Sequence, residues 1–149
     1  MQSIADASLG RPGDTASKHV HGLMVTPAKR SSHPTETGMA RLSLNDADKQ
    51  VRDWFRATVE SLGCEYSFDQ MGNQFAIRAG KNKTAPPVMM GSHLDTQPTG
   101  GRYDGILGVN AGLEVLKVLN DNNVETEGSI GVVNWTKYAL ICCCATERC

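Results

Sequence analysis

The sequence predicts an α/β domain, because helical and strand patterns alternate along its middle and a short apolar run leads into a glycine-rich loop. The chain has 149 residues, a length that suits one domain, with 40% hydrophobic and 21% charged residues. We expect residues 1–40 to form a poorly ordered leader, since Gly, Pro, Ser and Thr recur there without a sustained apolar period. The ordered domain is expected over residues 41–136, followed by a tail of different character over 137–149.

The composition argues against nucleic acid and membranes as partners. The formal net charge is −1 and aromatic residues make up 5% of the chain, so no basic or base-stacking surface is expected. No apolar run approaches the roughly 18 residues that span a bilayer, and the N-terminus lacks the pattern of a secretory signal. These features predict a cytoplasmic protein with reduced thiols. A mitochondrial presequence stays open as an alternative, because Arg11 and Lys18 fit one although Asp6 and Asp14 do not.

Two clusters in the leader and the tail carry residue types that bind metals. His19 and His21 have the spacing of one strand face, but two solvated histidines are the simpler interpretation. The adjacent thiols of Cys142, Cys143 and Cys144 suit soft metals, yet neighbouring residues point apart and do not easily share one ion. We therefore assign no site to either cluster.

The first ordered element is an amphipathic helix of about 17 residues that ends before Gly63. Ser43 or Asn45 is suited to cap its start, with Asp46 and Asp48 in the first turn. Apolar residues recur at helical spacing on one face, namely Val51, Trp54, Phe55, Val59 and Leu62.

A β-hairpin is predicted after this helix. Its strands are residues 64–69 and 73–78, which both alternate between apolar and polar side chains. Met71, Gly72 and Asn73 have the residue types of the connecting turn. Each strand is therefore expected to have one solvent-facing side.

A strand–helix–strand unit is predicted next. The apolar run over 88–92 suits a buried central strand, and the helix over 106–120 carries a broad apolar stripe that Leu107, Val115 and Val118 widen. A second buried strand is expected over 128–135. This order is typical of a βαβ unit with parallel strands and a right-handed crossover.

Candidate metal ligands flank the loop of this unit. His93 and Asp95 follow the first strand, and Asp104 precedes the helix, whose N–H groups would stabilise its negative charge. Imidazole and carboxylate suit Zn²⁺, Mn²⁺ or Ni²⁺, and Asp95 is placed to accept the second imidazole N–H and orient His93. The spacing of His93 and Asp95 alone is weak evidence, and a loop histidine paired with a neighbouring aspartate remains the alternative.

A longer pattern adds to this reading. The run from Gly91 to Val109 reads GSHLDTQPTGGRYDGILGV, and shorter segments are DKQVRDWF over 48–55 and DQMGN over 69–73. With these segments the chain, from about residue 38 to 135, resembles the M20-type metallohydrolases. Within them it is similar to the branch of N-carbamoyl-L-amino-acid hydrolase, β-ureidopropionase and allantoate amidohydrolase.

The resemblance implies a fold, roles and partners. The fold would be a truncated N-terminal part of an α/β/α metallohydrolase catalytic domain. His93 would bind one of two metal ions, Asp104 would bridge both, and Asp95 would be the catalytic acid that orients His93. The substrate would be a small ureido or amide compound such as an N-carbamoyl amino acid or β-ureidopropionate, cleaved at a C–N bond. The family is homodimeric, but its dimerisation domain is not recognisable here.

The resemblance stops after Thr136. The family continues there with paired glutamates, a general base and a metal ligand, whereas this chain has Lys137 and Tyr138. One hypothesis is that the tail is translated intron or out-of-frame sequence. Two functions therefore stay open: an incomplete chain of a metal-dependent hydrolase, or a catalytically inactive product of such a gene with at most weak metal or partner binding.

Overall fold

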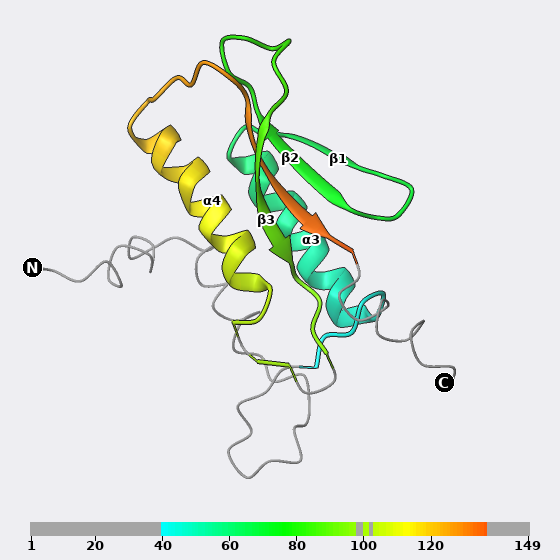
Figure 1. The fold of residues 1–149 in the computed structure, drawn as a ribbon. Coiled ribbons are helices and arrows are strands. Elements are labelled where there is room, and N and C mark those ends of the chain that lie inside the picture. Colours follow the sequence, from blue (N-terminus) through cyan, green and yellow to red (C-terminus); the bar gives the residue numbers. More distant parts are fainter. Residues whose placement is uncertain (1–39, 98–99, 102, 137–149) are drawn as a thin grey trace, which may run out of the picture.

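The computed structural model describes residues 40–97, 100–101 and 103–136, and these form two helices and a four-stranded sheet (Figure 1). The elements in chain order are α3 (Asp46–Ser61), β1 (Glu65–Phe68), β2 (Gln74–Arg78), β3 (Val88–His93), α4 (Ile106–Asp121) and β4 (Ile130–Trp135). The sheet order is β1-β2-β4-β3. The predicted α/β domain is confirmed, while the expected leader and tail lie outside the described residues.

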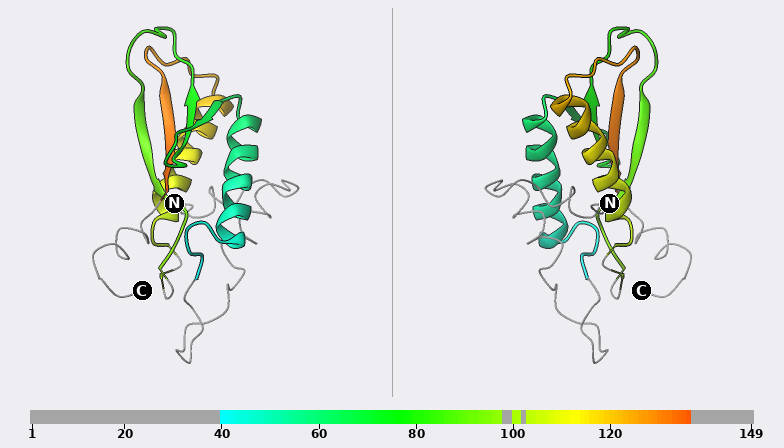
Figure 2. Two further views of the ribbon diagram at one scale, coloured as in Figure 1. Left: turned by 90° about the vertical axis from the view of Figure 1, so that its right-hand side faces the viewer. Right: turned by 90° about the vertical axis from the view of Figure 1, so that its left-hand side faces the viewer.

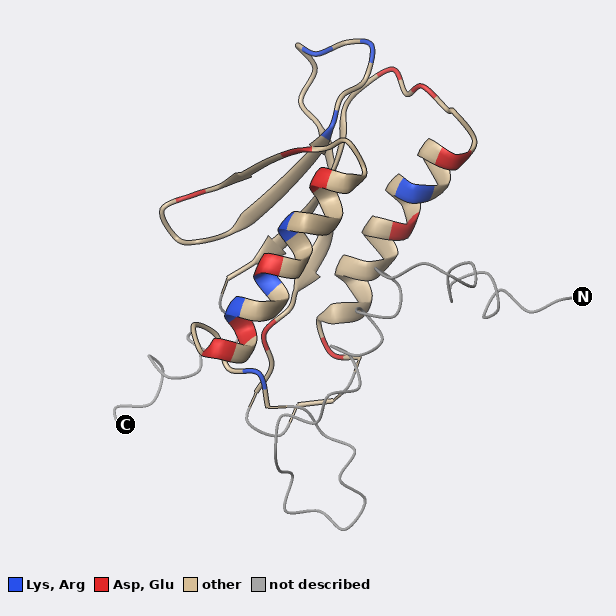
Figure 3. Ribbon diagram, turned by 180° about the vertical axis from the view of Figure 1, so that it is seen from behind, with Lys and Arg blue, Asp and Glu red and all other residues tan. Residues whose placement is uncertain are grey.

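Helix α3 begins at a side-chain cap. Asn45 accepts a hydrogen bond of 2.8 Å from the backbone N–H of Asp48, and so satisfies a donor that the first turn leaves open. The sequence offered Ser43 or Asn45 as the cap, and the structure has Asn45 in this position. Acidic and basic residues recur along α3 (Figure 3), among them the exposed pair of Lys49 and Asp53.

The hairpin and its turn are present as predicted. Strands β1 and β2 pair antiparallel, with Tyr66 opposite Ala76. Asp69 holds the turn, because its carboxylate accepts hydrogen bonds from the backbone N–H groups of Met71 and Asn73 and from the Asn73 amide. Gly72 takes a positive φ of 79° at the tip.

The βαβ unit is confirmed in its pairing but not in the position of its first strand. Strands β3 and β4 are parallel neighbours, with His93 opposite Trp135. However, β3 lies at the edge of the described sheet, and Val88 is 66% exposed, so the prediction of a buried central strand is wrong within the described residues. β4 holds the interior position between β2 and β3. An apolar run alone cannot distinguish the two positions, because strand order depends on pairing between distant segments.

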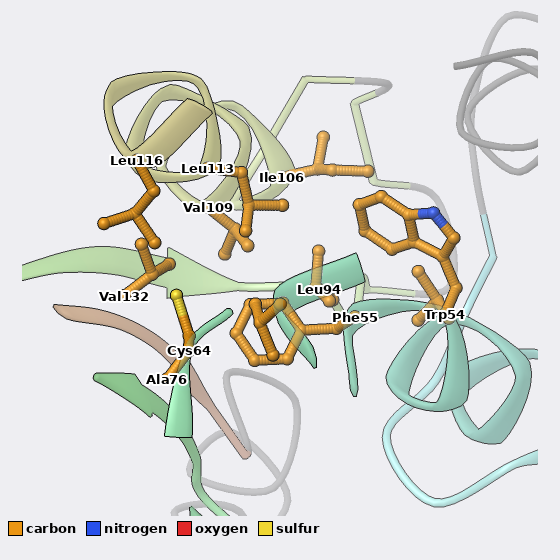
Figure 4. Close-up of a cluster of buried hydrophobic side chains, with 12 residues drawn as sticks. Trp54, Phe55, Cys64, Ala76, Leu94, Ile106, Val109, Leu113, Leu116 and Val132 are labelled. Atoms are coloured by element: carbon orange, nitrogen blue, oxygen red, sulfur yellow. The ribbon is translucent and has the colours of Figure 1, made fainter. Parts of the chain in front are cut away.

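Both helices pack on one face of the sheet, as the two side views show (Figure 2). The apolar stripe of α4 is narrower than predicted, since Leu107, Val115 and Val118 are exposed. The shared core is formed by side chains from α3, α4 and the sheet (Figure 4), namely Val51, Trp54, Phe55, Val59, Cys64, Ala76, Leu94, Ile106, Val109, Leu113, Leu116 and Val132. The apolar face of each element is thereby removed from water, which is the main stabilising term.

Glycines let α4 lie close to the sheet. A Cβ atom at Gly108 would lie 2.8 Å from the Cβ of Ser92, and one at Gly112 would lie 2.9 Å from Cγ2 of Val132. Together with Gly105, just before the helix, these residues form a row without side chains that faces β3 and β4. The separation between helix and sheet is therefore smaller than larger residues would allow.

The opposite face of the sheet carries apolar residues on β2, β3 and β4, and no helix of the described residues covers it. Phe75 and Trp135 meet there edge to face, with ring centroids 6.0 Å apart. Ile77 and Met89 flank the space above Gly131 on the same face. Neither of the two described helices has the length and apolar character needed to cross a bilayer.

Candidate metal site

His93 is the last residue of β3 and lies at the carboxyl end of the parallel strand pair. Ligand sites of α/β sheets gather at this end, where loops and helix N-termini meet. The His93 side chain is 12% exposed and that of Asp95 is 3% exposed, whereas that of Asp104 is 49% exposed. The structure thus brings the three predicted site residues together, two of them inside the protein and one at its surface.

The two nitrogens of the His93 ring have different surroundings. Nδ1 lies 2.9 Å from the backbone oxygen of Asp95 and 3.2 Å from its Oδ1. Both oxygens are acceptors, so the neutral ring carries its hydrogen on Nδ1 and its lone pair on Nε2. Nε2 faces Oδ1 of Asp104 at 4.0 Å. This orientation directs the atom that can bind a metal toward the second candidate ligand.

The pair of His93 and Asp104 fits one edge of a metal centre. Two atoms bound to one tetrahedral Zn²⁺ at about 2.0–2.1 Å lie about 3.4 Å apart. The observed 4.0 Å therefore requires the two side chains to approach by about 0.6 Å, which a half-exposed carboxylate permits. Within residues 40–97, 100–101 and 103–136, no three His, Cys, Asp or Glu side chains are grouped closely enough to hold an ion. The described residues thus fit part of a metal site.

The Asp95 carboxylate raises the pKa of His93 above its ordinary value of 6.5. The side-chain hydrogen bond is the largest cause, and partial burial opposes it. The carboxylate stabilises positive charge on the ring, whether that charge comes from a proton or from an ion at Nε2.

Asp104 lies just before α4 but is not its N-cap residue. Gly105 occupies the N-cap position with φ 73°, and no side chain there hydrogen-bonds a helix N–H group. A Cβ atom at Gly105 would lie 2.4 Å from Cε1 of His93 and 2.5 Å from its Nδ1. Gly105 therefore gives His93 its space as well as turning the chain into the helix.

The turn that carries Asp95 is held by residues that the sequence reasoning did not single out. Arg41, only 3% exposed, donates from Nε to the Leu94 carbonyl at 2.7 Å. Asn134 of β4, fully buried, accepts from the Leu94 N–H at 2.9 Å and donates to Gln74 at 2.7 Å. Asn134 had a readable signal, since a polar residue within a strand predicted to be buried needs buried partners. Arg41 had none, because it stands at the expected border of the leader.

Comparison with known proteins gives the site a context. No protein-family profile matches the chain. An N-carbamoyl-L-amino-acid amidohydrolase from Rhizobium meliloti is 46% identical over 99 residues, which are 66% of this chain and 24% of that protein. A ureidoglycolate hydrolase from rice, Oryza sativa subsp. japonica, is 31% identical over 98 residues. The chain spans about a quarter of the length of the curated relatives it matches.

Solved structures agree with the sequence comparison. An amidase of the hydantoinase/carbamoylase family from Burkholderia multivorans superposes with a TM-score of 0.74 at 42% identity. The match covers 89% of this chain and 31% of the amidase. The similarity is therefore one of both fold and sequence, over part of a longer protein.

Proposed function

The chain is related by sequence and fold to the hydantoinase/carbamoylase family of amidases, and we propose that it forms part of a metal-dependent hydrolase that cleaves ureido or amide C–N bonds. The observation that carries the proposal is the placement of His93 Nε2 opposite the Asp104 carboxylate. Two of the relatives that match are named for hydrolysis of ureido compounds.

Each of the three residues has a distinct task in this proposal. His93 would hold a divalent ion through Nε2, and Asp104 would be the carboxylate that bridges this ion to a second one. Asp95 holds the Nδ1 hydrogen of His93, which fixes the ring and makes Nε2 a better donor. The chemistry that such an ion would supply is activation of water and polarisation of the substrate carbonyl. The remaining ligands and the general base of such a centre would come from residues other than the three named here.

The substrate class is a small ureido compound, with an N-carbamoyl-L-amino acid as the leading candidate. The relative at 46% identity is named for that substrate, and the rice relative at 31% is named for ureidoglycolate. β-Ureidopropionate and allantoate are the other members of the class. Zn²⁺, Mn²⁺ and Ni²⁺ all suit imidazole and carboxylate ligands. We further propose that the complete protein is cytoplasmic and forms a homodimer. Within this chain, residues 41–136 would form the ordered part of the catalytic domain.

Activity of the complete natural protein that contains this chain tests the proposal. We expect turnover of an N-carbamoyl-L-amino acid that a chelator abolishes and that added Mn²⁺ or Zn²⁺ restores. His93→Ala should remove it, whereas Lys49→Ala on the exposed side of α3 should not. Absence of metal-dependent turnover on the whole panel of ureido and amide substrates would overturn the proposal.

A second candidate is that the 149-residue polypeptide alone is a non-catalytic product with weak metal binding. It is favoured by the fact that the described residues gather fewer than three potential ligands in any one place. We expect its turnover with added Mn²⁺ or Zn²⁺ to be near background. The chain has Lys137 and Tyr138 where the family has its paired glutamates, one of which is the general base, and a positioned base contributes about 10²–10⁴-fold to the rate. Turnover within about tenfold of the complete protein would rule this candidate out.

A further inference from the structure

Arg41 is a buried cation that brackets the turn from Leu94 to Thr96. Its Nε donates to the Leu94 carbonyl at 2.7 Å, and its backbone N–H donates to Oγ1 of Thr96 at 2.7 Å. Its carbonyl accepts a third hydrogen bond of 2.7 Å from the Thr96 N–H. Asp95 lies between the two residues that Arg41 holds, so its backbone position is fixed from both sides.

The charge of Arg41 is opposed by two buried carboxylates. Asp48 and Asp95 are 1% and 2% exposed, and each interacts electrostatically with Arg41 and with the other. The two carboxylates repel each other, and burial disfavours charge on all three groups. Arg41 supplies positive charge to both carboxylates, and Arg52 adds to it at Asp48. The Asp95 carboxylate therefore interacts with the charge of Arg41, and its Oδ1 lies 3.2 Å from the Nδ1 nitrogen of His93.

The same turn is also held by the core and by the sheet. The Leu94 side chain is fully buried and lies between α3 and α4 beside Phe55 and Ile106 (Figure 4). Its N–H donates to Asn134. These contacts hold Leu94 from two other directions, and burial of a further guanidinium carries a desolvation cost. What Arg41 adds is a positive charge near the Asp95 carboxylate.

We propose that Arg41 is a positioning residue for His93. It holds Asp95 so that its backbone oxygen and its carboxylate both face Nδ1, and this keeps the ring hydrogen on Nδ1 and the lone pair of Nε2 directed at Asp104. The purpose of this arrangement rests on the proposed function, but the arrangement itself needs neither metal nor substrate. It can therefore be tested in the metal-free 149-residue chain.

The ring tautomer of His93 is the direct readout, measured by ¹⁵N NMR at a pH where the imidazole is neutral. We expect the wild-type ring to carry its hydrogen predominantly on Nδ1. Arg41→Met should lower the ratio of the Nδ1–H to the Nε2–H form about tenfold, the change that loss of one charge-assisted hydrogen bond produces. Arg41→Lys should recover most of the ratio, because it restores the charge. A residue needed only for packing would not show this rescue.

The matched control is Arg56→Met, which removes an arginine from the exposed side of α3, where it pairs with Glu60. It should leave the His93 ratio unchanged. Thermal unfolding and the methyl signals of Val132 report whether each variant is folded. If Arg41→Met does not fold, Thr96→Val serves instead, because it keeps the guanidinium and removes the side-chain acceptor of the Arg41 N–H. We expect it to lower the ratio several-fold.

Two results would overturn the proposal. The first is a wild-type His93 ring that shows no preference for the Nδ1–H form. The second is a ratio of the Nδ1–H to the Nε2–H form that stays within twofold of the wild type in a folded Arg41→Met variant. If Arg41→Met does not fold, the same result in Thr96→Val counts instead. Failure of the hydrolysis assay would leave a positive tautomer result standing, so the two proposals fail separately.

Discussion

The Nε2 atom of His93, at the end of β3, lies 4.0 Å from Oδ1 of Asp104, two residues before α4. The two atoms belong to different parts of the fold, one to the sheet and one to the turn that leads into the helix. Their distance therefore depends on how helix and sheet pack. Asp95 acts from within the protein, whereas Asp104 faces solvent, where an ion and a substrate would arrive.

Replacement of Asp104 tests its role as a ligand. Asp104→Asn removes the negative charge that faces Nε2 while it keeps the size of the side chain. We expect the affinity for Zn²⁺ or Mn²⁺, measured by calorimetry, to fall by more than about tenfold, because an amide is a poor ligand for these ions. Asp53→Asn on α3 is the control and should bind as the wild type does. Equal affinities in the two variants would show that Asp104 is not a ligand.

The raised pKa of His93 predicts a pH dependence of stability in the metal-free chain. The folded protein holds the His93 proton more tightly than the unfolded chain does, chiefly through Asp95. This contribution is fully present below the ordinary pKa of 6.5 and is lost as pH rises through the folded value. Denaturant unfolding measured across this interval should show the decline, and Asp95→Asn should flatten it. A wild-type curve that rises with pH across the same interval would contradict the assignment.

Gly105 is predicted to be intolerant of any side chain. Gly105→Ala forces alanine to a φ of 73° and places Cβ against the His93 ring. We expect a backbone penalty of about 1–2 kcal/mol and a further 1–3 kcal/mol from the clash, measured as the free energy of unfolding. Metal binding at His93 should weaken in the same variant.

Gly63→Ala is the matched control for the backbone term. Gly63 has a φ of 75°, but no atom lies within 4 Å of the position of its Cβ. The Gly63→Ala variant should lose only about 1–2 kcal/mol in the free energy of unfolding, and its His93 signals should be those of the wild type. If the two glycine variants are equally stable, the contact between Gly105 and His93 has no energetic weight.

Asn134 is expected to be essential for the stability of the turn. Asn134→Leu fills the same space but leaves the Leu94 N–H and the Gln74 side-chain oxygen without their partner. We expect a loss of about 2–4 kcal/mol in the free energy of unfolding, since each buried unsatisfied group costs about 1–3 kcal/mol. Asn122→Ala, which removes an exposed hydrogen bond to Val118, should change stability by less than about 0.5 kcal/mol. A cost for Asn134→Leu as small as that would show that the network is dispensable.

Local patterns predicted the elements well, because their determinants lie close together in the chain. The spacing of Val51, Phe55 and Val59 predicted the helix that the structure contains, and Asn45 caps it. The residues around Gly72 predicted the hairpin turn. In both cases a few neighbouring residues decide the backbone conformation.

Distant pairings were not predictable in the same way. The apolar residues of β3 suggested a central strand, but Val88 is exposed because β4 takes the interior position. Arg41 is 53 residues from the carbonyl it binds, and no local pattern connects the two. For the candidate site, the sequence indicated the residues at positions 93, 95 and 104. Only the structure shows that Nδ1 of His93 faces Asp95 while Nε2 faces Asp104.

The row of Gly105, Gly108 and Gly112 determines how closely α4 approaches the sheet, because these residues have no side chains. Each lacks a side chain where the segment of Gly105 and α4 meets His93, Ser92 and Val132, so the backbone of this segment lies directly against these three residues. A single methyl group at any of these positions would push the helix outward, and Asp104, just ahead of the helix, would be carried along. These three glycines therefore help to set the distance between the His93 ring and the Asp104 carboxylate, although they need not contact an ion or a substrate.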